Sequence, residues 1–330
     1  MPTIPNGYFT DIYKLRLGNN NLWPPYTNIG SSKIKNLYVG GTRIYHPEAL
    51  DWVNRAQNNG GDIISFATLD AVSDFCYAID AAGLRDRFSR LNLFAGENWA
   101  GGPISYLIPV LTPLYRGFSF SGTQLGNTTD TNFNFVDDGT DYVRNVGLIG
   151  DGSTKALLTG LSSEASAGGV STFYDSHLST YAVTDNSGGG SQYALGCTDQ
   201  NNSIGTYLNF NDYAANTPFG TFSDWGTYAG GTNQTNNLGF TLSTTNGTNR
   251  KIYRNNTDIT ATSDNNGSGG DIADIGIFGF YDASYLVLEP VAYYAGSLGA
   301  YSIGKYLTSS QVSTFYSIMQ KFQTAMGRNV

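Results

Sequence analysis

The sequence predicts a mainly β protein, a sandwich or barrel of many short strands, and three observations indicate it. Tyr, Phe, Thr and Val recur between clusters of Gly, Asn, Asp and Ser, which is typical of strands separated by tight turns. Only 13% of the 330 residues are charged and 14% are aromatic, so the polar surface must come mainly from Asn, Thr, Ser and Gly. From about residue 103 the strand-like pattern continues with short helical stretches only near the end of the chain.

The predicted strands share β-branched or aromatic residues bounded by turn residues. They are Leu107–Tyr115, Tyr142–Leu148, Gly169–Tyr174, Gln192–Cys197, Gly205–Phe210, Leu238–Leu242, Arg250–Tyr253, Ile275–Phe280 and Val291–Tyr294. The separators between them are rich in Gly and Asn, which tolerate positive φ. We interpret the separators as loops within one domain, since strand content continues on both sides of each.

The first segment, residues 1–46, is rich in Pro, Asn and Gly and ends in a predicted β-hairpin. Two strand-like stretches flank the dipeptide Gly40-Gly41, which is a strong hairpin signal. An isolated two-stranded hairpin is marginally stable at best. We therefore expect it to pack on the rest of the chain or on a neighbouring subunit through its apolar residues, which are Ile34, Leu37, Val39, Ile44 and Tyr45.

Residues 47–102 are predicted to form a helical leader. Pro47 opens one amphipathic helix, which the Asn/Gly run at 58–61 ends. Thr68 is expected to cap a second helix, which Gly83 ends. The charged run that follows, from Arg85 to Arg90, is interpreted as ion-pairing surface.

The remaining segment, residues 103–330, is predicted to be the β domain with a helix at its end. Thr308 can cap this helix, which runs over 308–326 and stops at Gly327. Its apolar stripe is expected to dock on the sandwich.

Charge and cysteine content exclude several classes of protein. The net charge of -8 argues against a nucleic-acid partner, because phosphate binding needs clustered Lys and Arg. No stretch of about twenty apolar residues is present, and the first residues lack the basic and apolar regions of a signal peptide. We therefore expect neither membrane insertion nor export by that route. The two cysteines, Cys76 and Cys197, are expected to be free buried thiols.

A catalytic constellation is missing from the sequence, so we expect no enzymatic activity. A retaining glucanase needs two carboxylates about 5 Å apart, yet no two of the four glutamates are near in sequence. Asp137 and Asp138 form the densest acidic group with Asp141, but they precede a glycine and are interpreted first as a turn. The two histidines, His46 and His177, are not accompanied by a nucleophile elbow.

Calcium is the one cofactor that the sequence leaves open. Asp130, Asn132 and Asn134 supply oxygen ligands at alternate positions, but Phe135 stands where an EF-hand needs glycine. A second oxygen-rich loop follows at 264–271. Plain turns are the more common interpretation of both segments.

A sugar site would need an exposed aromatic platform beside amide or carboxylate groups. The best candidate is the loop with Trp225 and its polar neighbours, Asp224, Tyr228, Asn233 and Asn236. The alternative, that Trp225 is a loop anchor or a subunit contact, is the more common use of such a residue.

The sequence resembles concanavalin A-like lectin/glucanase modules in three segments. These are Ile252 to Ile259, Gly299 to Gly304, and Thr308 to Val312. In that family a tight turn joins two jelly-roll strands, and a later strand leads into a helix that begins with Thr, Gln and Val. Asn256 stands where glycine is usual, and Asn also adopts the left-handed conformation. The resemblance implies a concanavalin-like jelly-roll β-sandwich.

The chain is also similar to virion-associated proteins of tailed phages. The segments that carry this likeness are Phe75 to Leu93, Pro113 to Thr131, Ile149 to Lys155, Leu158 to Leu161 and Gly327-Arg328. In those proteins a helical leader precedes the jelly roll and a C-terminal helix ends in Gly-Arg. The resemblance implies a virion protein that is assembled in the host cytoplasm and binds other virion proteins of the capsid or tail.

Three hypotheses follow from these observations. The first is a non-enzymatic capsid or tail decoration protein that the hairpin residues anchor to the particle while a lectin-like domain projects. The second is a receptor-binding tail-fibre or baseplate protein that binds host surface glycans. The third is a glycan-degrading enzyme. In the first two cases we expect a homo-oligomer, because the hairpin and the sheets leave strand edges exposed.

Overall fold

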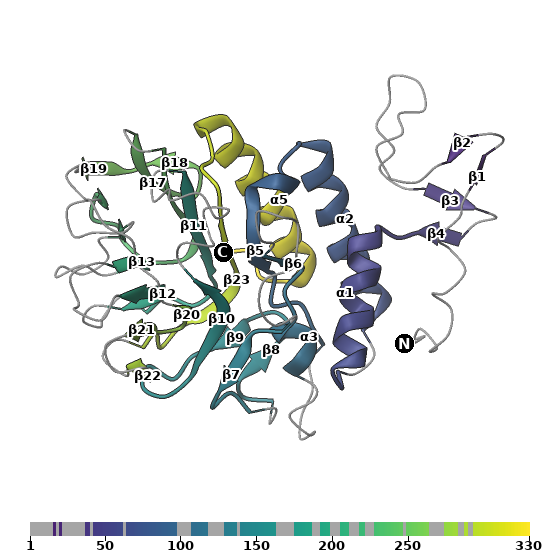
Figure 1. Ribbon diagram of the computed structural model, residues 1–330, viewed down its shortest axis with the longest axis horizontal. Helices are drawn as coiled ribbons and strands as arrows, with labels where there is room; N and C mark the ends of the chain where they lie inside the picture. The colour runs from purple at the N-terminus through teal and green to yellow at the C-terminus, as the bar shows by residue number, and fades with distance from the viewer. Residues whose placement is uncertain are drawn as a thin grey trace.

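Two largely antiparallel β-sheets face each other in the computed structural model, and three long helices cover the outer side of one sheet (Figure 1). The structure describes residues 16–17, 20–21, 37–39, 42–61, 64–97, 107–117, 129–136, 139–162, 175–186, 192–198, 205–210, 218–221, 228–246, 249–263, 274–282, 287–289 and 293–330. This confirms the predicted mainly β sandwich with its N-terminal hairpin, its leading helices and its C-terminal helix. No described helix is both long enough and apolar enough to span a bilayer.

The nine-stranded sheet has the order β18-β17-β16-β11-β23-β5-β6, and β9 pairs with β23 and β8 at its side. Its strands are β5 (Phe88–Asn92), β6 (Tyr115–Arg116), β8 (Tyr142–Val143), β9 (Gly147–Ile149), β11 (Ser176–Ala182), β16 (Gly239–Thr245), β17 (Arg250–Arg254), β18 (Thr257–Asp258) and β23 (Ser297–Gly304). Every residue of β11, β16 and β23 is buried. These central strands are covered on both faces, by the second sheet and by the helices.

The ten-stranded sheet has the order β19-β15-β14-β13-β12-β20-β10-β7, with β21 and β22 beside β12. Its strands are β7 (Thr131–Phe133), β10 (Ala156–Ser162), β12 (Tyr193–Thr198), β13 (Gly205–Asn209), β14 (Phe219–Thr221), β15 (Tyr228–Gly231), β19 (Thr260–Ser263), β20 (Asp274–Ile277), β21 (Phe280–Asp282) and β22 (Val287–Glu289). Its inner face packs Leu157, Leu195 and Ile277 against Leu178 and Tyr301 of the nine-stranded sheet, which forms the first hydrophobic core.

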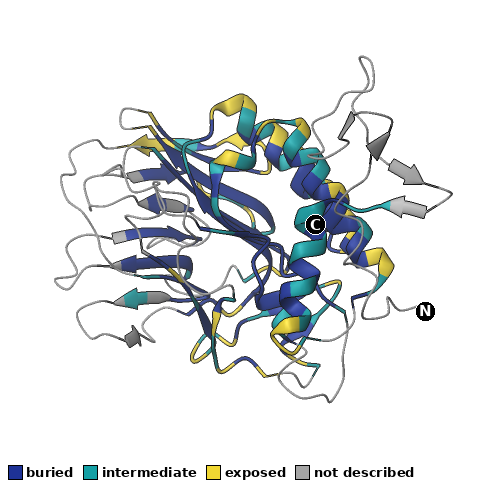
Figure 2. Cartoon of the chain, turned by 45° about the vertical axis from the view of Figure 1, so that its right-hand side comes forward, coloured by how far each residue is buried: buried dark blue, intermediate teal, exposed yellow. Residues whose placement is uncertain are grey.

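A second hydrophobic core lies between the nine-stranded sheet and the helices. α1 (Pro47–Asn58), α2 (Phe66–Ala81) and α5 (Ser309–Met326) contribute residues such as Trp52, Phe75 and Phe315, which pack on Phe240 and Phe88 of the sheet. Figure 2 shows buried residues along the central strands and exposed residues on the helices. The helices are therefore part of the folded body. β5, inside the predicted leader 47–102, also contributes a strand to the sandwich.

The helix ends agree with the sequence signals except at the start of α2. Thr308 forms a capping box with Gln311, and Gly327 ends α5 with φ at 81°. α2 begins three residues earlier than predicted, because Ser65 is its cap and accepts a hydrogen bond from the Thr68 N–H. Thr68 itself lies in the first turn of the helix.

Several predicted strands differ from the observed ones. The range 107–115 contains a short helix, α3 (Ile108–Leu111), in which Pro109 occupies a first-turn position, and only its last residue is in a strand. The range 142–148 is split into β8 and β9, and 275–280 is interrupted at Phe278, whose φ is 64°. The range 169–174 lies outside the described residues. Of 291–294, Tyr293 and Tyr294 are described and lie outside any strand.

Both tight turns predicted from short signals are present. β3 (Leu37–Val39) and β4 (Thr42–Ile44) pair antiparallel with Leu37 opposite Ile44, which confirms the hairpin around Gly40-Gly41. β17 and β18 pair across Asn255 and Asn256, both with positive φ. A second small pair, β1 (Arg16–Leu17) and β2 (Asn20–Asn21), precedes the hairpin. Both cysteines are free and buried, as expected.

Arg328 fixes the C-terminal end of the chain inside the body. Its guanidinium donates to the carbonyl oxygens of Arg144, Leu93, Gly299 and Phe94 and to the Tyr142 hydroxyl, and its side chain is 1% exposed. These carbonyls belong to three segments that are distant from one another in sequence and meet beside the end of α5. Burial lowers the pKa of Arg328, because removal from water disfavours the charged guanidinium. The five hydrogen bonds compensate for that cost.

The substitution Arg328→Met is expected to lower the free energy of unfolding by about 3 kcal/mol or more, because it leaves buried carbonyl oxygens without donors. Chemical denaturation followed by circular dichroism measures this. The control is Lys251→Met, which removes one partner of the exposed ion pair with Asp258 and should cost about 1 kcal/mol or less. Equal effects of the two substitutions would contradict the role given to Arg328.

Candidate functional site

Of the predicted sugar-binding residues, the structure describes Tyr228, Asn233 and Asn236. Asp224 and Trp225 lie outside the described residues, and Tyr228 opens β15, where its backbone pairs with Thr221. Asn233 is exposed and Asn236 half-buried in the loop from β15 to β16. The Asn236 side chain accepts a hydrogen bond from the Leu238 N–H and so shapes its own loop. The sugar site stays a prediction.

An amide-rich network that the sequence did not single out adjoins this loop. Asn237 accepts from the Asn186 N–H at 3.1 Å, and its own N–H donates to Asp185 at 3.2 Å. The Asn186 side chain donates to Gln192 at 2.9 Å. Asn237 is 2% exposed, and its amide nitrogen has no hydrogen-bond partner among the described residues. Side-chain amides therefore hold three loop segments together at this end of the sandwich, with a donor left over.

The three residues proposed for calcium do not point to a common centre. The Asp130 carboxylate faces inward and pairs with Arg90, whereas the Asn132 amide bonds the Phe135 carbonyl. The Asn134 amide bonds the Thr154 carbonyl on the exposed side. Among the described residues, no group of three His, Cys, Asp or Glu side chains could hold a metal ion. Calcium stays a prediction that this geometry does not strengthen.

Asp130 is instead the centre of a buried polar network between the two sheets. Arg90 of β5 donates to its carboxylate at 2.9 Å and also to the Thr159 carbonyl of β10. Asn92 and the Tyr301 hydroxyl donate to the same carboxylate, each at 2.8 Å. Burial opposes the charged guanidinium, but the negative Asp130 raises the pKa of Arg90 above its ordinary value. The network ties β5 and β23 to the opposite sheet.

The burial of Arg90 corrects the interpretation of the charged run at 85–90 as surface. Arg90 is 1% exposed and belongs to the sandwich interior, while Arg85 is about one quarter exposed. The reason is the alternation of β5, which turns Arg90 toward the second sheet. Arg85, at the start of the run, forms half-buried ion pairs with Asp80 and Glu48.

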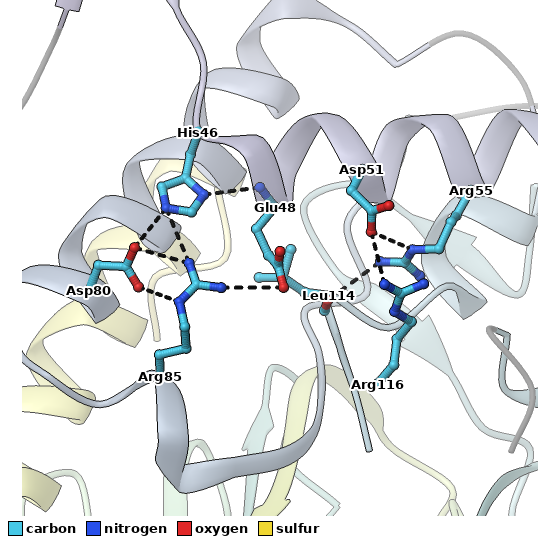
Figure 3. Close-up of polar contacts among 8 residues, drawn as sticks. All are labelled: His46, Glu48, Asp51, Arg55, Asp80, Arg85, Leu114 and Arg116. Carbon is cyan, nitrogen blue, oxygen red and sulfur yellow. Dashed lines mark hydrogen bonds and ion pairs between the residues drawn. The ribbon is translucent and has the colours of Figure 1, made fainter. Parts of the chain in front are cut away.

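The second cluster of charged groups lies where the N-terminal hairpin joins the helices (Figure 3). His46 is fully buried and caps α1, because its Nδ1 accepts from the Glu48 N–H at 3.1 Å. Its Nε2 lies 2.9 Å from Asp80 of α2, and Arg85 pairs with the same carboxylate at 2.7 Å. Arg85 also reaches Glu48 at 3.4 Å. We call His46, Glu48, Asp80 and Arg85 the hairpin clamp.

Two groups of the hairpin clamp, Asp80 and Arg85, have shifted pKa values. Burial alone would raise the pKa of Asp80, but hydrogen bonds from His46 and Arg85 outweigh it and lower that pKa. Burial also works against the charge on Arg85, and the hydrogen bond to Asp80 overcomes it and raises the pKa. The His46 backbone N–H donates to Ser73 at 2.8 Å, so backbone and ring are both fixed. The residue that follows the hairpin is therefore bonded to both α1 and α2.

A neighbouring ion-pair group joins α1 to β6 (Figure 3). Asp51 accepts from Arg55 at 2.8 Å and lies 3.4 Å from Arg116. Arg55 also donates to the Leu114 carbonyl. Burial disfavours the charged guanidinium and lowers the pKa of Arg55, and the hydrogen bond to Asp51 opposes this effect.

Of the residues proposed as hairpin anchors, the structure describes the side chains of Ile44 and Tyr45. Ile34 lies outside the described residues, and for Leu37 and Val39 the structure describes the strand but not the side chains. Ile44 and Tyr45 are half-buried, and Tyr45 packs against the core between the helices and the sheet. The anchoring role stays a prediction.

His177, whose ring lies next to a serine, is closed off from solvent. His177 of β11 is fully buried, donates from Nδ1 to the Lys305 carbonyl at 2.6 Å and lies 2.9 Å from the Ser302 hydroxyl. Ser302 in turn contacts Ser179 at 2.6 Å. Burial lowers the pKa of His177 to about 4. The arrangement links two central strands and gives a substrate no access to the serine.

Comparisons with known proteins assign no family to the chain. No family model matches it, and no curated protein matches it. Among solved structures, it is similar to domain 4 of AbnA, a GH43 extracellular arabinanase from Geobacillus stearothermophilus in complex with arabinotriose. That likeness has 14% identity and a TM-score of 0.40 over 69% of this chain and 98% of the other. A Trypanosoma rangeli sialidase mutant with trans-sialidase activity shows 10% identity and a TM-score of 0.37, over 76% of this chain and 39% of the sialidase.

Removal of the buried charge Asp130 should destabilise the sandwich strongly. Asp130→Asn leaves Arg90 without its counter-charge, and we expect a loss of about 3–5 kcal/mol in the free energy of unfolding. Urea denaturation measures the loss. Asp258→Asn, at the exposed pair with Lys251, is the matched control and should change it by about 1 kcal/mol or less. A loss at Asp130 no larger than that at Asp258 would show that the network is not what holds the sheets together.

His177 should make stability depend on pH between about 4 and 6.5. Its folded pKa of about 4 lies below its ordinary value of 6.5, so the unfolded chain binds the extra proton first as pH falls. The stabilising contribution is complete above pH 6.5 and is lost toward pH 4, with a total of about 3 kcal/mol. Denaturation midpoints measured across this range should fall more steeply for the natural chain than for His177→Gln. Parallel curves for the two proteins would contradict the assignment.

Proposed function

We propose that the protein is a non-enzymatic structural protein of a tailed-phage particle, a capsid or tail decoration that is held by its N-terminal hairpin. The proposal rests on the position of the hairpin and on its unpaired strand edges. Among the described strands, β3 and β4 pair only with each other, and they lie beyond α1 and α2 on the side away from the sandwich (Figure 1). A two-stranded hairpin with free edges gains stability by pairing or packing with a partner.

The hairpin clamp supports an anchoring role. A bound hairpin can orient the body only if the residues that join the two are held in place. The joining residue is the buried His46, which is bonded to Glu48 and Asp80. β4 ends at Ile44, two residues before His46. Binding of the hairpin to a particle would thus orient the whole sandwich rather than tether it loosely. The partners in this proposal are other virion proteins, and the site of action is the virion.

A second candidate function is glycan binding by a receptor-binding tail or baseplate protein. The amide network at Asp185, Asn186, Asn237 and Gln192 favours it, since amides and carboxylates are the groups that bind sugar hydroxyls. This network adjoins the loop with Asn233 and Asn236. Binding on a glycan array that is lost in Asn233→Ala or Asn236→Ala would favour this function over decoration.

Particle incorporation tests the proposed function directly. Phage particles assembled with Leu37→Asp/Val39→Asp should lack the protein after gradient purification, while the variant stays folded in the soluble fraction. Thr262→Asp, at an exposed position of β19, is the control and should be incorporated normally. Immunogold labelling of particles with the natural chain should show it on the head or along the tail. Normal incorporation of the double variant would overturn the anchoring role, and label confined to the tail tip would favour receptor binding.

A further inference from the structure

We infer that the N-terminal segment of one copy, residues 1–46, binds the ten-stranded sheet of a second copy, so that the chains associate head to tail. The inference rests on the opposite charges of these two parts and on their positions at opposite ends of the molecule. It goes beyond the proposed function, because it names a contact between copies that needs no particle.

The N-terminal segment is basic, although the whole chain is acidic. The segment has five Lys or Arg residues and one Asp, so its net charge is +4. The whole chain has 18 Lys or Arg and 26 Asp or Glu, so the remaining residues have 13 and 25, a net charge of -12. The basic excess is therefore confined to the part of the chain that contains the hairpin. The charged residues of the segment are Asp11, Lys14, Arg16, Lys33, Lys35 and Arg43.

The ten-stranded sheet has the opposite composition, because none of its strands contains a Lys or an Arg. Its carboxylates are Asp274 in β20, Asp282 in β21 and Glu289 in β22. Nine of the ten strands come from two stretches, 156–249 and 259–304, and the sequence has no Lys or Arg in either stretch. The same stretches contain eleven Asp or Glu. This sheet and its connections are therefore the acidic part of the chain.

Asp274 gives a local view of this imbalance. It is half-buried at the start of β20, and burial raises its pKa. Among the described residues, no cation offsets that rise. A positive charge from outside the copy would favour the ionised carboxylate, so this side of the sandwich gains from a basic partner.

The fold holds the basic and acidic parts apart within one copy. The hairpin of β3 and β4 lies beyond α1 and α2, whereas the ten-stranded sheet lies on the other side of the nine-stranded sheet (Figure 1). His46, which joins the hairpin to the body, is buried and bonded to both α1 and α2. The helical layer and the nine-stranded sheet thus stand between the two. The opposite charges of the hairpin and of the sheet therefore meet between copies.

A second copy fits both parts of the chain at once. Its acidic sheet attracts the segment of the first copy, and its own segment is left to bind the sheet of a third or of the first. Such a contact joins different surfaces of the two copies, so it closes into a ring or continues as a row. A nucleic acid could occupy only the segment, whose Lys and Arg are spread along the sequence, and the acidic body would repel it.

Two complementary charge variants test the contact by sedimentation velocity. Lys33→Glu/Lys35→Glu removes the positive charge of the segment, and Asp282→Lys/Glu289→Lys removes negative charge from the sheet. The natural chain should associate with rising concentration, and less so when salt is raised from about 50 mM to about 500 mM. Each variant alone should associate about tenfold more weakly or less. An equal mixture should recover a dimer, because the natural segment of one variant meets the natural sheet of the other.

Two further variants separate the contact from general effects of charge and folding. Lys305→Glu/Lys321→Glu makes the same change in net charge after β23 and on α5, and it should associate like the natural chain. Asp264→Lys/Asp271→Lys places the reversal in the connection between β19 and β20, and it should weaken association even if the strand variant does not fold. Circular dichroism checks that each variant is folded.

Three results would overturn the inference. Association that neither salt nor these variants change would place the contact elsewhere. A mixture that fails to recover the dimer would contradict the head-to-tail arrangement. A natural chain that stays monomeric would exclude the contact, and its retention on duplex DNA at the same salt would show that the segment binds a nucleic acid instead. A monomeric chain that still enters particles through Leu37 and Val39 would leave the proposed function standing, so the two failures are distinguishable.

Discussion

The buried ion pair between Arg90 and Asp130 is the interaction on which the rest of the architecture depends. It crosses the interior of the sandwich, where Tyr301 and Thr159 complete the hydrogen bonds of both charges. Because Arg90 lies on β5, which pairs with β23 in the nine-stranded sheet, the ion pair joins this sheet to the opposite one. α1 and α2 precede β5, and α5 follows β23, so the helices connect directly to these two neighbouring strands. The strands that the ion pair fixes are therefore also the strands that carry the helical layer.

Both ends of the folded body are secured by buried polar residues that sit beside helix ends. His46 caps the start of α1 where the hairpin enters, and Arg328 follows the Gly327 that ends α5. The Gly-Arg pair that follows α5 therefore has a physical reason in this chain. Gly327 turns the backbone, and Arg328 then reaches carbonyl oxygens of distant segments, including Leu93 and Gly299. A lysine could not make these contacts equally, because it lacks the planar fork of donors.

The sequence predicted what depends on neighbouring residues and missed what depends on distant ones. The hairpin at Gly40-Gly41 and the caps of α5 follow from local turn and capping chemistry, and both are present. The central strand β11 was missed because its Ser, Thr and His residues look exposed in sequence. They are buried in pairs across strands, as Ser179 is with Ser302. Asp130 was a candidate calcium ligand for the same reason: its partner Arg90 lies forty residues away, so only the fold reveals the pairing.

The placement of charges shows how a chain with few of them uses several in its interior. The buried arginines include Arg55, Arg90, Arg254 and Arg328. Each of these four donates hydrogen bonds inside the folded body, and the acceptors include Leu114, Asp130, Asn236 and Gly299. Burial opposes each of these charges, so acceptors have to lie beside each guanidinium. The interior of the sandwich is therefore held by specific polar contacts as well as by its two hydrophobic cores.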